Sequence, residues 1–216
     1  CVFLYDFLKN SQSHIVSLSD RIKTEFIRRG IDGTNVSVLP CGIDTQSYAL
    51  DVDDVLFPDK SIVVGKIEPR KRQAHLQKQN LRIDFVGNVS DQSFDTSDPS
   101  YLGEQSKQDI MDNLTAYANM VLLSSGEAHP FVCLEGLAAG LGLVLSEQST
   151  ANLDVSQPFI TVIPDDKIND FDYLREKIEQ NRMISLSMRY KIRQYCYENF
   201  DWLKIIKKYK EIINSI

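Results

Sequence analysis

"NMVLLSSGEAHPFVCLEGLAAGLGLVLS", residues 119–146, combines two aliphatic runs with a polar loop and a segment rich in small residues. The first run, 119–125, is short and almost continuously apolar, which predicts a buried strand. The loop carries Glu127, and residues 133–140 are typical of a short helix. The second run, 141–146, predicts another buried strand. A strand, a helix and a strand in this order favour a parallel βαβ unit.

The same alternation extends over most of the chain. Further strands are predicted at 14–19, 36–44, 61–67, 82–88 and 159–164. Further helices are predicted at 20–30, 70–80, 105–118, 167–180, 184–199 and 201–216. We therefore expect an α/β fold with a doubly wound parallel sheet and C-terminal helices.

Composition limits the classes of function. The chain has 216 residues, of which 43% are hydrophobic, so a sizeable core is expected. The formal net charge of -6 argues against a nucleic-acid binder with a broadly basic face. Cys1, Cys41, Cys133 and Cys196 show no CxxC spacing, which predicts reduced thiols and neither disulfides nor zinc. That cysteine usage indicates a cytoplasmic compartment, and the apolar runs are shorter than the roughly 18 residues of a transmembrane helix.

Two acids, Glu127 and Glu135, lie eight positions apart where the strand 119–125 leads into a helix. Ligands of open α/β sheets bind at the carboxyl ends of the strands. We expect Glu127 in the loop and Glu135 in the first helical turn, close to the amides of 131–134. Carboxylates accept hydrogen bonds from vicinal hydroxyls and helix amides attract phosphate, so a nucleotide-sugar suits both groups. Two alternatives stay open: Glu135 stabilises the helix dipole, or the two acids serve a glycoside hydrolase.

A basic cluster follows the strand 61–67. Gly65 ends the apolar run and permits close approach of a ligand to the backbone. The cluster consists of Lys66, Arg70, Lys71 and Arg72. Lys66 and Lys71 are candidates for neutralising a diphosphate, and a solvated helix start is the alternative. Neither GxGxxG nor GxxxxGK[ST] occurs, which disfavours a dehydrogenase-type dinucleotide fold and a P-loop.

Several segments resemble the retaining glycosyltransferases of family four and occur in the order seen there. They are HIVSLSDRIKTEFIRRGI, VSVLPCGIDTQSY, VVGKIEPRKR, YANMVLLSSGEAHPFVCLEGLAAGLGLVLSE and ANLD. The most specific match is the E-x7-E motif from Glu127 to Glu135. PCGID resembles the P-x-G-[IV]-D that opens the family's nucleotide-binding domain. The resemblance covers nearly the whole chain and implies the Rossmann-like, C-terminal donor-binding domain of the two-domain GT-B fold.

The resemblance also implies roles for individual residues. Lys66 and Lys71 would bind the donor diphosphate and, with Glu127, form the catalytic set. Glu127 and the backbone of 128–131 would face the donor sugar, and Glu135 would hold the ribose. The complete donor-binding set implied is Gly65, Lys66, Lys71, Ala128, His129, Pro130, Phe131, Val132 and Glu135.

Two departures from the family pattern affect these roles. Lys66 stands where the family usually has arginine, and lysine lacks the bidentate fork of a guanidinium group. The loop EAHPFV replaces the commoner E-G-F-G, so the donor-sugar preference does not carry over. His129 is a candidate for contact with the donor sugar, but a lone loop histidine is expected to be exposed.

The expected organisation has three parts. Residues 1–35 resemble the last strand-helix unit of an N-terminal acceptor domain, 36–200 form the nucleotide-sugar-binding domain, and 201–216 form a C-terminal crossover helix. The start inside an apolar segment, without an initiator methionine, predicts that the chain lacks most of the acceptor domain. The final helix carries one apolar stripe: Trp202, Ile205, Ile206, Tyr209, Ile212, Ile213 and Ile216. We expect the stripe to pack into a core, with a membrane-surface helix as the alternative.

Together these features predict a glycosyltransferase of the hexosyltransferase type, incomplete as this chain. It would transfer a sugar from a nucleoside-diphosphate sugar to a glycan, lipid or protein acceptor with retention of anomeric configuration. The expected partners are the donor, the acceptor and the N-terminal domain, with no nucleic acid, no cofactor and no metal. The expected location is cytoplasmic, with peripheral membrane association as a variant. The alternatives are a non-catalytic nucleotide-sugar-binding or scaffolding module of the same fold and a nucleotide-sugar epimerase.

Overall fold

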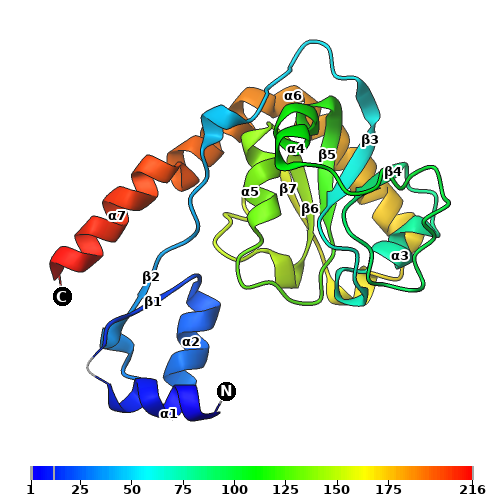
Figure 1. Cartoon of the computed structure of the whole chain (residues 1–216). Helices are drawn as coiled ribbons and strands as arrows, with labels where there is room; N and C mark the ends of the chain where they lie inside the picture. Colours follow the sequence, from blue (N-terminus) through cyan, green and yellow to red (C-terminus); the bar gives the residue numbers. More distant parts are fainter. Residues whose placement is uncertain (1, 12, 216) are drawn as a thin grey trace.

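A five-stranded sheet forms the main body of the computed structural model, which describes residues 2–11 and 13–215 (Figure 1). The strand order is β4-β3-β5-β6-β7, and each neighbouring pair is parallel. The strands are β3 (Phe57–Val64), β4 (Ile83–Val86), β5 (Tyr117–Leu122), β6 (Gly142–Ser146) and β7 (Ile160–Ile163). The predicted α/β class with a parallel sheet is therefore confirmed.

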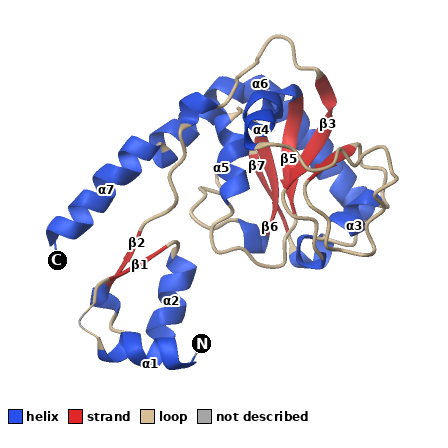
Figure 2. Cartoon of the chain, in the orientation of Figure 1, coloured by secondary structure: helices blue, strands red, loops and turns tan. Residues whose placement is uncertain are grey.

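Helices cover both faces of this sheet (Figure 2). Successive strand residues point to opposite faces, so Ile62 and Val63 of β3 belong to different core clusters. Ile62 packs in the cluster that contains Leu134 of α5 (Phe131–Ala138) and Ile110 of α4 (Lys107–Asn113). Val63 packs in the cluster that contains Leu76 of α3 (Gln73–Gln77). β4, β5 and β6 are buried along their whole length, which explains their mostly apolar sequences.

One long helix, α6 (Phe171–Phe200), replaces the two helices predicted at 167–180 and 184–199. The structure buries the polar residues Asn181, Arg182 and Ser185, at and just after the predicted gap, against the amino ends of the strands. Asn181 donates to the carbonyl oxygens of Leu143 and Phe159, and Ser185 donates to Ala118 O at 2.6 Å. These side chains donate hydrogen bonds to carbonyl oxygens at the strand ends. One continuous helix therefore covers the region where two helices were predicted.

The predicted helix 105–118 is also shorter than expected. α4 ends at Asn113, a 3-10 turn follows (Leu114–Ala116), and β5 begins at Tyr117. Tyr117 pairs with Phe57 of β3, and its carbonyl oxygen accepts a bond from the buried Arg189 of α6. Sheet pairing at these positions outweighs the helical pattern of the local sequence.

A small N-terminal unit precedes the sheet. It contains α1 (Val2–Asn10), β1 (Ile15–Ser17), α2 (Asp20–Arg28) and β2 (Val36–Val38). Ser19 is the residue before α2, and its hydroxyl makes no capping bond. β2 pairs in parallel with β1, so the predicted boundary between 35 and 36 falls between two paired strands. Strand pairing groups 36–38 with the N-terminal unit.

The final helix, α7 (Trp202–Ser215), runs away from the five-stranded sheet towards the side of the N-terminal unit (Figure 1). Only Ile205 of this helix is buried among the described residues, whereas Trp202, Tyr209 and Ile213 are about half exposed. The predicted packing of the whole stripe into a core is therefore wrong for the described part, and Ile216 lies outside it. No helix in the described part of the chain is long and apolar enough to cross a membrane.

Cys41, Cys133 and Cys196 are free thiols, as predicted, and Cys1 lies outside the described residues.

Candidate functional site

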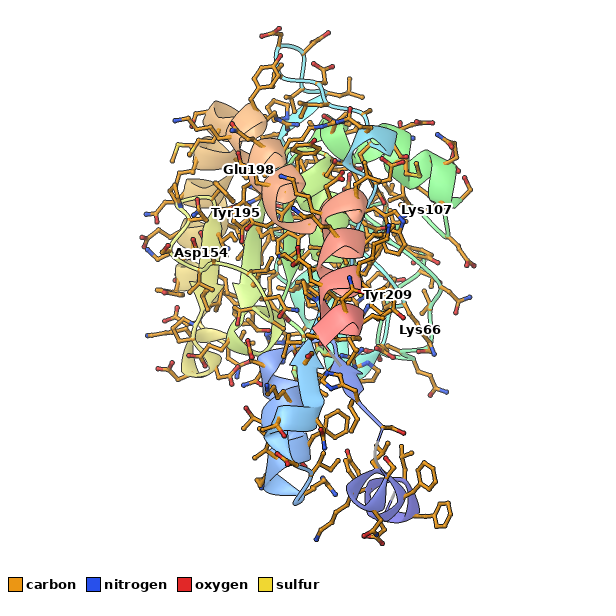
Figure 3. The ribbon with its side chains drawn as sticks, turned by 90° about the vertical axis from the view of Figure 1, so that its left-hand side faces the viewer. Lys66, Lys107, Asp154, Tyr195, Glu198 and Tyr209 are labelled. Atoms are coloured by element: carbon orange, nitrogen blue, oxygen red, sulfur yellow. The ribbon has the colours of Figure 1, made fainter. Side chains whose placement is uncertain are left out.

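The carboxyl ends of β3 and β5 lie at the open end of the sheet. The residues of α6 that bond to the sheet lie at its opposite end, at the amino ends of the strands. The segments that meet at the open end are the loop after β3 (65–72), the loop after β5 (123–130) and the first turns of α4 and α5. Figure 3 shows Lys66 and Lys107 on the same side of the molecule. The open end is where the sequence places its candidate ligand site.

Two glycines shape the ends of β3 and β4. Gly65 and Gly87 have φ angles of +131° and +145°, which favour glycine. A Cβ atom at Gly87 would collide with the carbonyl oxygen of Gly65, so the two strand ends approach as closely as backbone permits. A Cβ atom at Gly65 would lie 2.7 Å from Lys71 Nζ. The Lys71 ammonium group is therefore folded back onto the end of β3.

Lys66 and Lys71 lie on either side of the turn that follows β3. Neither ammonium group has a hydrogen-bond or ion-pair partner among the residues that the structure describes. Lys66 is exposed and lines a pocket of about 280 Å³. The pocket is also lined by Val64, Gly65, Val86, Gly87, Asn88, Glu104, Gln105 and Ile110. Two free cations beside an open pocket form an arrangement that attracts a phosphorylated ligand.

The turn itself differs from the expected helix start near Pro69. Pro69–Lys71 form a 3-10 turn, Arg72 adopts a left-handed conformation with φ 59°, and α3 begins only at Gln73. The buried Gln73 side chain donates to Lys66 O at 3.0 Å and accepts from Glu68 N at 3.1 Å. These two bonds fix the backbone between Lys66 and Glu68.

Arg70 organises the loop that carries Glu127, a role that sequence reasoning missed. Its guanidinium group donates to Glu127 Oε1 at 3.0 Å and to Ser124 Oγ at 3.0 Å, and it also contacts Gly126 O. The other terminal nitrogen, Nη2, forms an ion pair with Glu68 Oε1 at 2.7 Å. Arg70 thus links the loop after β3 to the loop after β5 and holds the Glu127 carboxylate in place.

Glu135 does not lie in the first turn of α5, contrary to the prediction. The helix begins at Phe131, so Glu135 lies in its second turn, and the proposed helix-dipole role loses its geometric basis. Its side chain is only 11% exposed. Tyr48 Oη donates to Glu135 Oε1 at 3.1 Å, and Lys107 Nζ forms an ion pair with the same oxygen. Tyr48 ends the quoted segment VSVLPCGIDTQSY, but no role was predicted for it or for Lys107.

Cys133 lies in the first turn of α5, and its thiol is buried. Burial is the main cause that raises the pKa of this thiol. The negative charges of Glu127 and Glu135 raise the pKa further, and the positive charge of Lys71 lowers it. Lys71, Glu127 and Glu135 are thus close enough to this thiol for their charges to affect its pKa.

The segment between these acids begins α5. Ala128 and Phe131 are exposed, Val132 is half-buried, and Pro130 precedes the first helical residue without a side-chain cap. The backbone N–H groups of Phe131 and Val132 begin a helix, where such groups have no intrahelical partner.

His129 is buried rather than exposed, which corrects the prediction. Its Nδ1 atom lies 2.9 Å from Asn152 Nδ2 and 3.3 Å from Ala151 O. Burial lowers the pKa of this histidine below its ordinary value. His129 therefore anchors the loop to residues 151–152.

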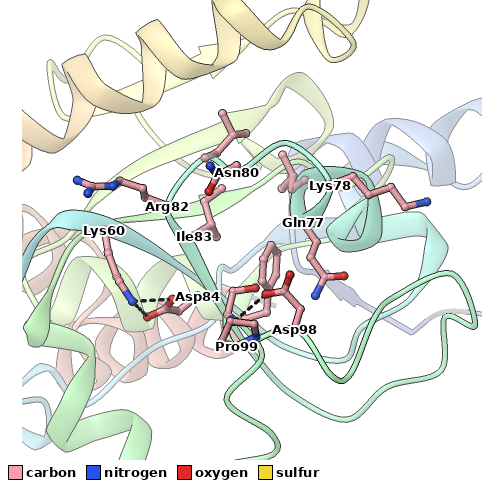
Figure 4. Close-up of a pocket in the computed structure, with 13 residues that line it drawn as sticks. Lys60, Gln77, Lys78, Asn80, Arg82, Ile83, Asp84, Asp98 and Pro99 are labelled. Carbon is pink, nitrogen blue, oxygen red and sulfur yellow. Dashed lines mark hydrogen bonds and ion pairs between the residues drawn. The ribbon is translucent and has the colours of Figure 1, made fainter.

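A larger cavity, of about 440 Å³, lies at the amino end of β4 (Figure 4). Lys60 forms an ion pair with the buried Asp84 at 3.0 Å there, and Tyr117 Oη donates to Asp84 at 3.0 Å. These groups satisfy one another, and the cavity is remote from the converging charges. Within residues 2–11 and 13–215, no group of three His, Cys, Asp or Glu side chains is placed to hold a metal ion.

Comparison with solved structures places the fold among the GT-B glycosyltransferases. Anabaena HepE in complex with UDP-glucose matches with a TM-score of 0.79 and 13% identity over 100% of this chain and 67% of HepE. The lipopolysaccharide outer core galactosyltransferase WaaB, in its apo form, matches with a TM-score of 0.73 and 17% identity over 93% of this chain and 61% of WaaB. Sucrose-phosphate synthase from Thermosynechococcus elongatus matches with a TM-score of 0.74 and 15% identity over 98% of this chain and 60% of the synthase.

No family model and no curated protein sequence matches the chain. At these identities the structural likeness shows the fold, and the chain spans about two-thirds of each enzyme or somewhat less.

Proposed function

We propose that the chain contains the donor-binding domain of a retaining glycosyltransferase that uses a nucleoside-diphosphate sugar. The observation that carries the proposal is that Lys71 folds back onto the glycine end of β3, while Arg70 joins the loop after β3 to Glu127 in the loop after β5. The fold shared with HepE, which was solved with UDP-glucose, supports this reading and suggests uridine diphosphate as the donor nucleotide.

In this proposal each charged group binds one part of the donor. Lys66 and Lys71, which have no protein partner in the described structure, bind the diphosphate. Glu135 accepts hydrogen bonds from the ribose. Glu127, held by Arg70, faces the sugar together with the backbone of 128–131. The pocket beside Lys66 receives the base.

The chemistry is electrostatic. As the bond between the sugar and the diphosphate breaks, negative charge develops on the leaving phosphate oxygens. Lys66, Lys71 and the free amides at the start of α5 stabilise that charge in fixed positions. No resident cofactor takes part in these steps, and the acceptor is a glycan, a lipid or a protein.

A panel of nucleoside-diphosphate sugars tests the proposal. Calorimetric titration of the 216-residue chain with glucose linked to UDP, GDP, ADP or CDP is expected to give binding for one base, displaced by the matching free diphosphate. Equal binding of the free nucleoside, or no binding of any member, contradicts the proposal. Chromatography of the sugar after incubation distinguishes an epimerase, which alters the sugar while it stays linked to the nucleotide.

A further inference from the structure

Glu135 uses only one of its two carboxylate oxygens within the protein. Oε1 accepts hydrogen bonds from both Tyr48 Oη, at 3.1 Å, and Lys107 Nζ. Oε2 has no donor among the described residues, and it is not among the enclosed polar atoms that lack a partner. A carboxylate with one oxygen held and the other open is oriented to accept a bond from a ligand.

Tyr48 is a permanent donor to this carboxylate. The side chain is buried, with 4% exposure, and burial and the charge of Glu135 both raise the pKa of its hydroxyl far above neutrality. The phenol therefore keeps its proton at neutral pH. A hydrogen bond from Arg193 of α6 to Tyr48 O, at 2.8 Å, fixes the backbone of Tyr48.

Lys107 supplies the countercharge that a nearly buried carboxylate needs. Lys107 is the first residue of α4, and its ammonium group lies 5.1 Å from the ring centre of Tyr48 and 5.4 Å from that of Phe131. Two residues earlier, Gln105 lines the pocket beside Lys66. The ion pair between Lys107 and Glu135 therefore connects Glu135 to the segment that lines the pocket beside Lys66.

We infer that Tyr48 and Lys107 are positioning residues, which hold Glu135 through Oε1 so that Oε2 receives the ribose hydroxyls of the nucleotide. This inference rests on the proposed function and deepens it. The pair acts through the orientation of Glu135, so its effect is specific to ligands that carry ribose hydroxyls. Uridine diphosphate and its 2′,3′-dideoxy analogue differ only in those hydroxyls and isolate the effect.

The test is calorimetric titration of both diphosphates into the wild-type chain, Tyr48→Phe, Lys107→Met and Glu135→Gln. The Kd of the dideoxy analogue divided by the Kd of uridine diphosphate measures the preference for ribose. This ratio is expected to fall roughly three- to tenfold in Tyr48→Phe and in Lys107→Met, the size of one hydrogen bond. The Kd of the dideoxy analogue should stay unchanged in Tyr48→Phe. Adding Tyr48→Phe to Glu135→Gln should lower the ratio no further, because the residue acts through Glu135.

Tyr195→Phe and Lys78→Met are the matched controls, because Tyr195 bonds to Asp154 N and Lys78 is an exposed lysine at another cavity. Both should keep the wild-type ratio, and melting curves confirm that each variant is folded. An unchanged ratio in folded Tyr48→Phe and Lys107→Met overturns the inference while the proposed function stands. Tighter binding of uridine diphosphate by Lys107→Met also overturns it, since Lys107 would then compete with the ribose. If the panel shows preference for another base, the diphosphate of that base and its dideoxy analogue are titrated instead. Failure of the wild-type chain to bind any member of the panel removes the proposed function and this inference together.

Discussion

Arg70 shows how a single residue connects the two halves of the proposed site. Arg70 is one of the four basic residues in the cluster after the strand 61–67, and no role was predicted for it. The structure shows that Arg70 is already engaged with Glu127, Glu68 and Ser124, whereas the two lysines have no partner among the described residues. Arg70 therefore supports the loop and the lysines stay available for a ligand.

Replacing Arg70 should affect the sugar end of the donor. In Arg70→Ala, Glu127 loses its ion pair, and the affinity for UDP-glucose is expected to fall by about 1 to 2 kcal/mol. The affinity for UDP should change little, because UDP lacks the sugar that Glu127 faces in the proposal. Titration of both ligands measures the difference, with Arg175→Ala, which breaks an exposed pair with Asp172, as the control. Equal losses for both ligands would argue against a sugar-facing role for Glu127.

His129 predicts a pH dependence of stability. Burial lowers its pKa below the ordinary value of 6.5, so at neutral pH the ring is uncharged in both the folded and the unfolded chain. As the pH falls below 6.5, the unfolded chain takes up the proton first, and the free energy of unfolding decreases until the pH reaches the folded pKa. In that window the loss is at most about 1.4 kcal/mol per pH unit.

Urea unfolding of wild type and His129→Asn between pH 7.5 and 5 measures this contribution. The variant should lose less stability on acidification than the wild type. Parallel curves for the two proteins would show that His129 does not contribute.

At the scale of elements, the central packing of α6 against the sheet depends on Gly142. A Cβ atom at this position would lie 2.9 Å from Ser185 Cβ, 3.0 Å from Asn181 Oδ1 and 3.0 Å from Phe159 O. Gly142→Ala is therefore expected to lower the free energy of unfolding by about 1 to 3 kcal/mol through overpacking. Gly126→Ala is the matched control, since an added Cβ there meets nothing within 4 Å. Thermal melts that place both variants within experimental error of each other would refute the packing argument.

The sequence predicted most elements because the strands are short apolar runs with turn residues between them. It predicted the βαβ unit of β3, α3 and β4 and the strand-helix-strand order around Glu127. The continuity of α6 could not be predicted, because Asn181 and Ser185 look like surface residues until the strand ends they satisfy are known.

The site was predicted in the same uneven way. The spacing of their motifs singled out Lys71, Glu127 and Glu135, and their roles in binding stay predictions. Tyr48 and Lys107 are separated from Glu135 by 87 and 28 positions, and only the folded chain brings them to the same oxygen.

At the scale of the whole molecule, the charges are distributed so that one edge of the sheet is free to bind a ligand. The polar and cationic residues of α6 occupy the amino ends of the strands, and the chain as a whole carries a net charge of -6. Lys66 and Lys71 at the opposite edge therefore stand out as positive charges without partners among the described residues. This separation is what we expect of a domain that stabilises itself at one end of the sheet and binds a diphosphate at the other.

The most direct test of this account is the titration of uridine diphosphate and uridine into the wild-type chain and Lys71→Ala. We predict that Lys71→Ala weakens the binding of uridine diphosphate by about 1.5 to 3 kcal/mol and leaves the binding of uridine nearly unchanged. The difference should shrink as salt is added, because screening acts over about 8 to 10 Å at physiological ionic strength. Lys78→Ala, an exposed lysine away from this edge, should change neither affinity. Equal losses for uridine and its diphosphate in Lys71→Ala, or no preference for the diphosphate in the wild type, would contradict a diphosphate site at the carboxyl end of β3.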